Sequence, residues 1–179
     1  MATFAKIKMA SEDVNSLLLT GKFKANANYA EVEDGALVVV GDLDASTVYA
    51  GNKDMNVFEI KAPAADTDEI AIVDIADVSK GDVRGEAWRV GIRTDGLVGE
   101  AGQPVRVRLL KKYDRFWISG DAFDGEAKVG EYATAKADST KFAPAAVAAT
   151  GKFCVKIEMA KDFVLGQTVA GKMYYCRVL

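Results

Sequence analysis

The chain has 179 residues, half of them hydrophobic, and a formal net charge of −3 from 23 basic and 26 acidic side chains. This length and composition predict one globular domain, or one domain with an arm. Histidine is absent, which excludes histidine-dependent catalytic triads and the commonest ligand of transition metals. The acidic balance argues against nucleic acid as the main partner, because phosphate binding needs a net basic face.

The N-terminal segment differs from the rest of the chain. Residues 1–28 are expected to form an N-terminal arm or a peripheral strand, and the pattern leaves an ordinary first strand of the domain equally open. Residues 2–9 alternate loosely, with Phe4 and Ile7 among the apolar positions. The sequence Ser11-Glu12-Asp13 is typical of the start of one short helical turn.

Residues 29–179 are predicted to form a β-barrel or β-sandwich domain. The stretch V-E-D-G-A-L-V-V-V-G-D-L, residues 32–43, is a short valine-rich run bounded by Gly and Asp, which favours a buried strand. Similar runs recur along the chain, and they predict further strands at residues 57–60, 69–75, 86–93, 105–110, 115–119, 129–133, 153–159 and 173–179.

Turn signals separate these runs, and little of the sequence between them has a helical period. This pattern is typical of an all-β fold, so we expect at most two short helices. A helix at residues 143–149 is weakened by Pro144 and Val147. The predicted core contains the following side chains: Leu37, Val39, Val57, Ile72, Val90, Val107, Trp117, Val155 and Ile157. Trp88 is expected in the core as well.

The cellular setting is inferred from what the sequence lacks. The first ten residues carry lysines and no apolar run of the signal-peptide kind, and no segment is apolar enough for a membrane span. Cys154 and Cys176 are too few for a disulfide framework, so free thiols are expected. We therefore expect assembly in a reducing cytoplasm, with no membrane partner.

Candidate chemistry is sparse. Asp42-x-Asp44 and Asp66-x-Asp68-Glu69 resemble fragments of cation sites, but neither stretch supplies a full set of oxygen ligands, which favours solvated turn acids. The string G-E-A-G at residues 99–102 is followed by a strand and not by a helix, so it is interpreted as a turn. No catalytic residue, metal site or cofactor is predicted, and a carboxylate-dependent hydrolase is the last-ranked function.

Two segments are candidate partner contacts. Arg106, Arg108, Lys111 and Lys112 lie on or beside one strand, where they form either its solvated face or a docking surface for an acidic protein. Phe4 and Ile7 lie in the N-terminal segment, whose backbone is suited to pairing with the sheet edge of another chain.

Three groups of segments carry a resemblance to a known class of proteins. They are E-V-E-D-G-A-L-V-V-V-G-D-L, then V-F-E-I-K-A-P-A-A-D-T-D-E-I-A-I-V, and then K-K-Y-D-R-F-W-I-S-G-D-A-F with V-G-E-Y-A-T-A and F-A-P-A. In their layout, over residues 30–179, they resemble the capsid decoration proteins of tailed bacteriophages, also called cement or head accessory proteins.

The resemblance implies a small β-barrel or β-tulip-like domain, sometimes preceded by an N-terminal arm. It also implies a non-enzymatic virion structural protein that binds the major capsid protein on the capsid exterior and stabilises the head. Self-association, as a homotrimer or through neighbouring copies, stays open. The alternative is a β-rich module of a phage fibre or tail that binds carbohydrate or a host surface.

Overall fold

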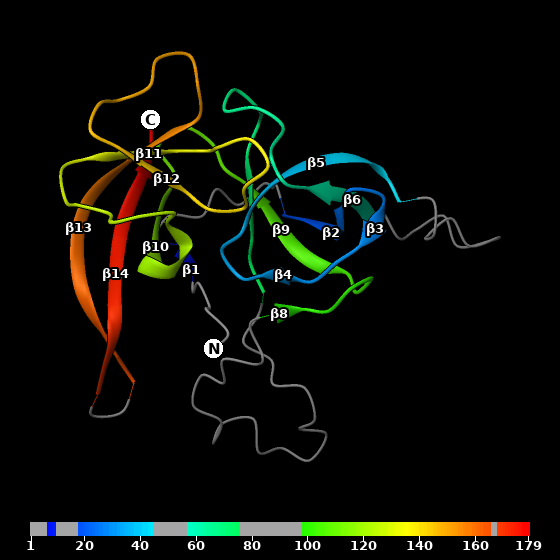
Figure 1. Cartoon of the computed structure of the whole chain (residues 1–179), viewed down its shortest axis with the longest axis horizontal. Helices are drawn as coiled ribbons and strands as arrows, with labels where there is room; N and C mark the ends of the chain where they lie inside the picture. Colours follow the sequence, from blue (N-terminus) through cyan, green and yellow to red (C-terminus); the bar gives the residue numbers. More distant parts are fainter. Residues whose placement is uncertain (1–6, 10–17, 45–56, 76–97, 166–167) are drawn as a thin grey trace.

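The computed structural model describes residues 7–9, 18–44, 57–75, 98–165 and 168–179. These residues form a small β-barrel with a six-stranded sheet beside it (Figure 1). In this part of the chain the only helical element is a single 3₁₀ turn, η4 (Gly120–Ala122). The prediction of a mostly β fold with a small barrel is therefore confirmed.

The barrel is closed by five strands. Around the wall they follow the order β2 (Leu18–Ala25), β6 (Val57–Lys61), β5 (Leu37–Leu43), β7 (Ala71–Val73) and β9 (Val105–Leu109), and β9 pairs with β2 to close it. The β2–β6 pair is parallel, and the other pairs are antiparallel. Short strands extend the barrel: β3 (Asn28–Tyr29) pairs with β2, and β4 (Val32–Glu33) pairs with β8 (Val98–Gly99).

The second layer is an antiparallel sheet. Its order is β1 (Ile7–Met9), β10 (Arg115–Ser119), β14 (Thr168–Val178), β13 (Cys154–Leu165), β11 (Tyr132–Thr134) and β12 (Ala143–Ala145). Within this sheet, strands β13 and β14 form a long ribbon, which lies at the left of Figure 1 with the barrel at the right. A register shift between Ile157 and Met159 interrupts this ribbon as a β-bulge does.

Two hydrophobic clusters hold the layers. The first fills the barrel and contains Phe23, Val32, Ala36, Val38, Ile60, Ala71, Val73, Val105 and Val107. The second lies between the barrel and the sheet, and its largest members are Leu37, Ile70, Ile72, Phe116, Ile118, Phe123, Phe142, Ile157 and Tyr174. Because the second cluster draws side chains from both layers, the barrel and the sheet share one core.

Close packing in the barrel explains why residue 21 is a glycine. Gly21 lies in the middle of β2, and a Cβ atom at this position would lie only 2.6 Å from Cγ2 of Ile60 on the neighbouring β6. A larger residue would push Ile60, which is fully buried, out of place. The glycine therefore allows the parallel strands β2 and β6 to pack with a bulky isoleucine between them.

Most of the predicted core is confirmed, and one position is wrong. Leu37, Val57, Ile72, Val107, Val155 and Ile157 are buried, and Val39 is partly buried against the shared core. Trp117 is only half-buried, because its neighbours Phe116 and Ile118 point into the core and Trp117 points to the opposite face of the sheet. Val90, Trp88 and the strand predicted at 86–93 lie outside the described residues.

The N-terminal segment is divided by the structure. Leu18–Ala25 is a wall strand of the barrel, which agrees with the second interpretation of this segment, an ordinary strand of the domain. Ile7–Met9 is an edge strand of the six-stranded sheet. The helical turn predicted from Ser11 through residues 17–19 is wrong at residues 18 and 19, which belong to β2, and the rest of it lies outside the described residues. The helix considered at 143–149 is not formed, and residues 143–145 are strand β12.

Both cysteines are free and buried. In the β13–β14 ladder Cys176 lies opposite Ile157, and the N–H of Leu179 donates to the carbonyl of Cys154. Burial, reinforced by the nearby carboxylate of Glu158, raises the pKa of the Cys176 thiol to about 12. The Cys176 thiol is therefore protonated and unreactive in the folded protein.

The assigned strand faces predict the effect of two core substitutions. Replacing Val107 or Ile157 by Asp buries a carboxylate without a partner, and each variant should lose several kcal/mol of unfolding free energy in denaturant titration. Val147→Asp is the matched control, because Val147 is 77% exposed and this variant should melt like the parent. If both core variants were as stable as the parent, the assigned register of β9 and β13 would be contradicted.

Burial of both thiols predicts their reactivity. In the folded protein a thiol reagent at mildly alkaline pH should modify Cys154 and Cys176 slowly, because both side chains are buried and the Cys176 thiol has a raised pKa. After unfolding in concentrated guanidinium chloride without reductant, both thiols should react at once. Recovery of a Cys154–Cys176 cross-link by mass spectrometry would contradict the free-thiol assignment.

Candidate partner-binding surface

The two arginines predicted as contacts lie on the outer side of the barrel. They alternate along β9 with Val105 and Val107, which face the barrel interior. Both bind Asp74: Arg106 Nη2 lies 3.0 Å from Oδ1, and Arg108 Nη2 lies 3.5 Å from Oδ2. Arg106 also donates from Nε to the Asp74 carbonyl, at 3.1 Å. One carboxylate therefore neutralises part of this basic face.

The two lysines lie in the turn that connects β9 of the barrel to β10 of the sheet. Lys111 forms an ion pair with Glu69. The turn is held by Asp114, whose Oδ2 accepts the Lys111 N–H at 2.7 Å and whose own N–H donates to the Lys111 carbonyl at 3.0 Å. This local clamp leaves Lys112 exposed at the tip of the turn.

Tyr113 joins Lys112 at this tip and was not among the residues that the sequence predicted. Its side chain is 64% exposed, and Lys112 Nζ lies 5.2 Å from the ring centroid. Its φ of +77° is in the left-handed region, and its N–H donates to the carbonyl of Val178 at 2.9 Å. A strained, exposed tyrosine beside a lysine is a better candidate contact than the arginines bound to Asp74. In the sequence, the signal that could have pointed to this exposed tip is the run K-K-Y-D between two predicted strands.

The N-terminal strand pairs with the strand that follows this turn. Met9 pairs with Phe116 and Ile7 pairs with Ile118, so β1 runs antiparallel to β10, the strand that follows the turn. Strand β1 is the outermost strand of the sheet order on that side. Phe4 lies outside the described residues. The structure therefore places Ile7 on the strand that pairs with β10, opposite Ile118, which is six positions along the chain from Lys112, and it does not bring the two predicted contacts together.

A second charged group lies on the barrel, around Glu59 on β6. Its carboxylate binds Lys24 at 2.5 Å and Lys61 at 3.3 Å. The hydrogen bond to Lys24, followed by that to Lys61, lowers the pKa of Glu59, and the bond to Glu59 raises the pKa of Lys24. Lys24 and Glu59 are half-buried and Lys61 is exposed, so the cluster is a surface ion-pair network.

A buried carboxylate stabilises the neighbouring β3 hairpin. Asp44 is fully buried, and the hydroxyl of Tyr29 donates to its two oxygens at distances of 2.8 and 2.9 Å. Lys22 Nζ lies 3.7 Å from the same carboxylate, and Lys24 Nζ lies 5.0 Å from the Tyr29 ring centroid. The arrangement satisfies a buried charge and does not resemble a catalytic dyad.

An open cavity of about 610 Å³ lies beside this cluster. It is lined by Phe23, Lys24, Ala25, Asn26, Lys61, Ala62, Asp138 and Thr140. Both lysines of the lining already bind Glu59. The cavity therefore offers no concentrated charge of one sign to a ligand.

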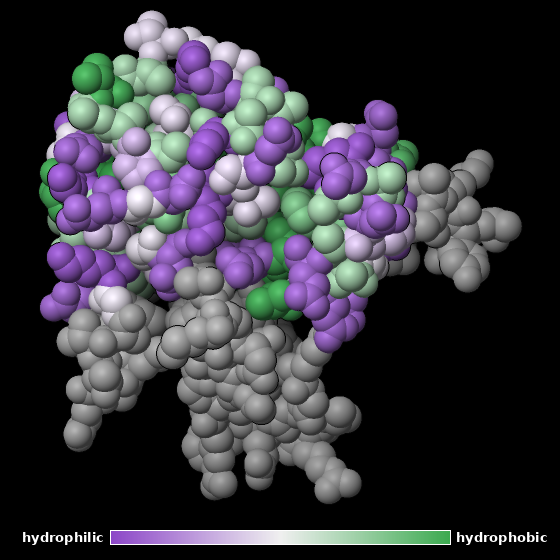
Figure 2. Space-filling view, in the orientation of Figure 1, coloured by the Kyte–Doolittle hydropathy of each residue, from purple (hydrophilic) through white to green (hydrophobic). Residues whose placement is uncertain are grey.

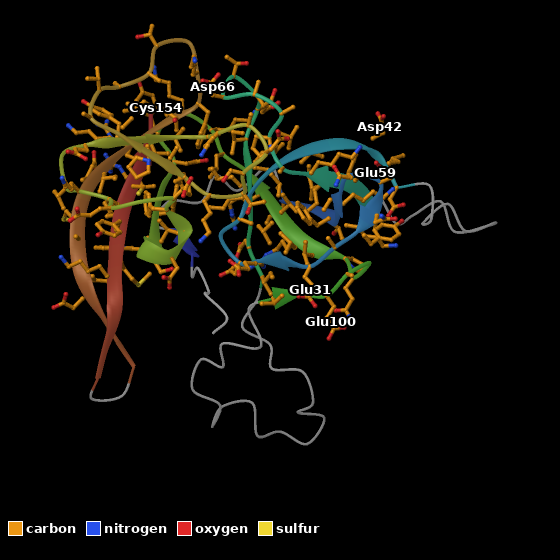
Figure 3. All side chains as sticks on the ribbon, in the orientation of Figure 1. Glu31, Asp42, Glu59, Asp66, Glu100 and Cys154 are labelled. Carbon is orange, nitrogen blue, oxygen red and sulfur yellow. The ribbon has the colours of Figure 1, made fainter. Side chains whose placement is uncertain are left out.

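The acidic turns considered as cation sites have other roles. Asp68 Oδ2 accepts the backbone N–H groups of Ala64 and Ala65, Asp66 pairs with Lys152, and Asp42 is exposed. Figure 3 shows Asp66 far from Glu31 and Glu100, which lie at the other end of the barrel. Among the described residues no group of three acidic or cysteine side chains is placed to hold a metal ion.

Comparison with known proteins identified no relative of this chain. No protein-family model matches this chain, and neither a curated protein nor a solved structure matches it. Within the described residues no helix is long and apolar enough to cross a membrane.

The lowered pKa of Glu59 predicts a small pH dependence of stability. A carboxyl group whose folded pKa is depressed stabilises the fold above its unfolded pKa of 4.5, and this contribution is lost as the pH falls through the folded pKa. Glu59→Gln should therefore reduce the loss of thermal stability on acidification below 4.5. Asp42→Asn, at an exposed position on the adjacent β5, is the control and should follow the parent. Identical acid profiles for Glu59→Gln and the parent would contradict the assigned pairing.

Proposed function

We propose that this protein is a non-enzymatic structural protein that binds the exterior of a tailed-bacteriophage head and stabilises it. The segments that resemble decoration proteins support this proposal because each forms a defined part of the fold. Residues 32–43 form β4 and β5, residues 57–73 form β6 and β7, and residues 111–145 form the turn, β10, β11 and β12. The partner under this proposal is the major capsid protein.

The observation that carries the proposal is the exposed Lys112–Tyr113 turn, which leads into β10, the strand that pairs with the edge strand β1. Met9 is paired with Phe116, four positions after Lys112. An edge strand offers backbone groups for pairing with another chain, and an exposed Lys–Tyr pair offers charge and aromatic contact area. The edge strand and the turn therefore offer the two kinds of contact that a shell-binding protein uses.

The fold also suits a mechanical role. The barrel and the sheet share a hydrophobic core, so a load on the sheet is transmitted to the barrel through packed side chains. The turn between the layers is anchored on the sheet side by the Tyr113–Val178 hydrogen bond and on the barrel side by the bond of Leu110 N–H to the Ile70 carbonyl, at 3.0 Å. A contact made through this turn is therefore held rigidly.

Co-sedimentation with purified, DNA-free tailed-phage heads tests the proposal. We expect the parent chain to bind heads, and Lys112→Glu with Tyr113→Ala to weaken binding, more strongly at low salt because exposed charges are screened beyond about 8 Å at physiological ionic strength. Lys128→Glu, at an exposed residue in the loop before β11, is the charge-matched control and should bind like the parent.

Two truncations separate the arm from the strand. A chain lacking residues 1–6 loses Phe4 and keeps β1, whereas a chain lacking residues 1–10 loses both. We expect each truncation to weaken binding with little dependence on salt, because main-chain pairing is insensitive to screening. Parental binding by both truncations would exclude the arm as a contact. If the parent chain bound to a glycan array and not to heads, the result would favour the fibre or tail module instead.

A further inference from the structure

The outer face of the six-stranded sheet, on the side away from the barrel, carries two rows of side chains with a common register. The first row runs across three strands: Trp117 on β10 lies opposite Tyr175 on β14, and Tyr175 lies opposite Met159 on β13. The inner neighbours Phe116, Ile118 and Cys176 are fully buried, which places this row on the opposite face. Met159 is 49% exposed, and Trp117 and Tyr175 are half-buried.

The second row is cationic. Arg115 lies opposite Arg177, Arg177 lies opposite Lys156, and Lys156 lies opposite Tyr132 of β11. Like charges directly opposite one another on a sheet destabilise it. Arg177 is compensated by Glu158, with Nε 2.7 Å from Oε1. The repulsion within this row is therefore offset in part by Glu158.

Lys161 adds a further positive charge to this face. Its Nζ lies 4.2 Å from the ring centroid of Trp117, although Lys161 belongs to β13 and Trp117 to β10. Its side chain therefore reaches across the intervening β14, where Met173 is opposite Lys161 and buried. On the outer side of β10, β14 and β13, four described basic side chains, Arg115, Arg177, Lys156 and Lys161, stand with one acidic side chain, Glu158, in a chain with a net charge of −3. In Figure 2 hydrophilic residues cover much of the side where β13 and β14 lie.

We propose that this face, defined by Trp117, Tyr175, Met159, Lys156, Lys161 and Arg177, is a docking surface for an acidic polypeptide. Tryptophan, tyrosine, methionine and arginine are the residues enriched in protein–protein interfaces, and the surplus of positive charge selects an acidic partner. The surface adjoins β1, where Lys8 is paired with Trp117, but its defining residues are other than those of β1 and the Lys112–Tyr113 turn, so it does not depend on the proposed head-binding function.

The geometry favours a polypeptide over single-stranded nucleic acid. A base needs an open aromatic face on which to stack. The ring face of Trp117 is covered by the Lys161 ammonium group, and the rings of Trp117 and Tyr175 pack against each other at 5.1 Å with an interplanar angle of 47°. The aromatic row is therefore an edge-exposed ridge and not a set of parallel platforms.

Fluorescence anisotropy with labelled poly-L-glutamate tests the proposal. The full chain should bind this probe, and Lys156→Glu with Lys161→Glu should weaken binding by about tenfold or more, equivalent to about 1.4 kcal/mol. Lys61→Glu with Lys152→Glu makes the same change in net charge at exposed positions, one on the barrel strand β6 and one paired with Asp66 in the loop after β6, and is the matched control. The control should bind the probe like the parent.

A stability measurement accompanies the binding assay. Because Lys156 opposes Arg177, replacing it by Glu should leave the thermal midpoint unchanged or raise it, so a loss of binding cannot be attributed to unfolding. Equal probe affinities for Lys156→Glu with Lys161→Glu and for the control pair would overturn the proposal. So would tighter binding of an oligothymidylate of similar length, or a dimer in sedimentation velocity that the face variant alone converts to a monomer. These two outcomes identify nucleic acid and a second copy of the chain as the occupant.

Discussion

The strand pair β5–β7 is the element on which the rest of the structure depends, because it is buried on both faces. Leu37 lies opposite Ile72, and both face the six-stranded sheet, whereas Val38 lies opposite Ala71, and both face the barrel interior. A shift of register by one residue would exchange these two sets of side chains and mismatch both cores at once. Correct pairing of β5 with β7 therefore specifies the barrel and the docking of the sheet together.

This shared wall explains why charged side chains gather at the rims and outer faces. The acidic residue that follows each of these strands has a partner, and neither is exposed: Asp74 is half-buried and Asp44 is fully buried. Asp74, which follows β7, binds both arginines of β9, and Asp44, which follows β5, accepts the Tyr29 hydroxyl. The carboxylates at the ends of β7 and β5 are thus satisfied by side chains from the neighbouring strands β9 and β3.

The fold class and most of the core could be predicted from the sequence because period-2 alternation is a local signal. It identified the inward positions of residues 105–109 and the buried strand at 37–40. It failed at Trp117, because three large apolar residues stand in succession at 116–118 and local alternation alone does not decide which of them face the core. It left β2 open between an arm and an ordinary strand of the domain, since the inward positions of that strand are filled by Gly21 and Phe23, and Gly21 carries no hydrophobic signal.

The candidate surfaces were less predictable, because they depend on partners that are distant in the sequence. A run of basic residues was visible, but its neutralisation by Asp74 and Glu69 follows from the pairing of β7 with β9. Conversely, Arg115, Arg177 and Lys156 belong to three segments, none of which is strongly basic alone, and the register of β10, β14 and β13 assembles them into a cationic row. In an antiparallel sheet the charge of a surface is a property of register and not of any local window. A basic run that is adjacent in sequence therefore overstates the charge available to a partner, whereas a row that is adjacent only across strands is hidden until the fold is known.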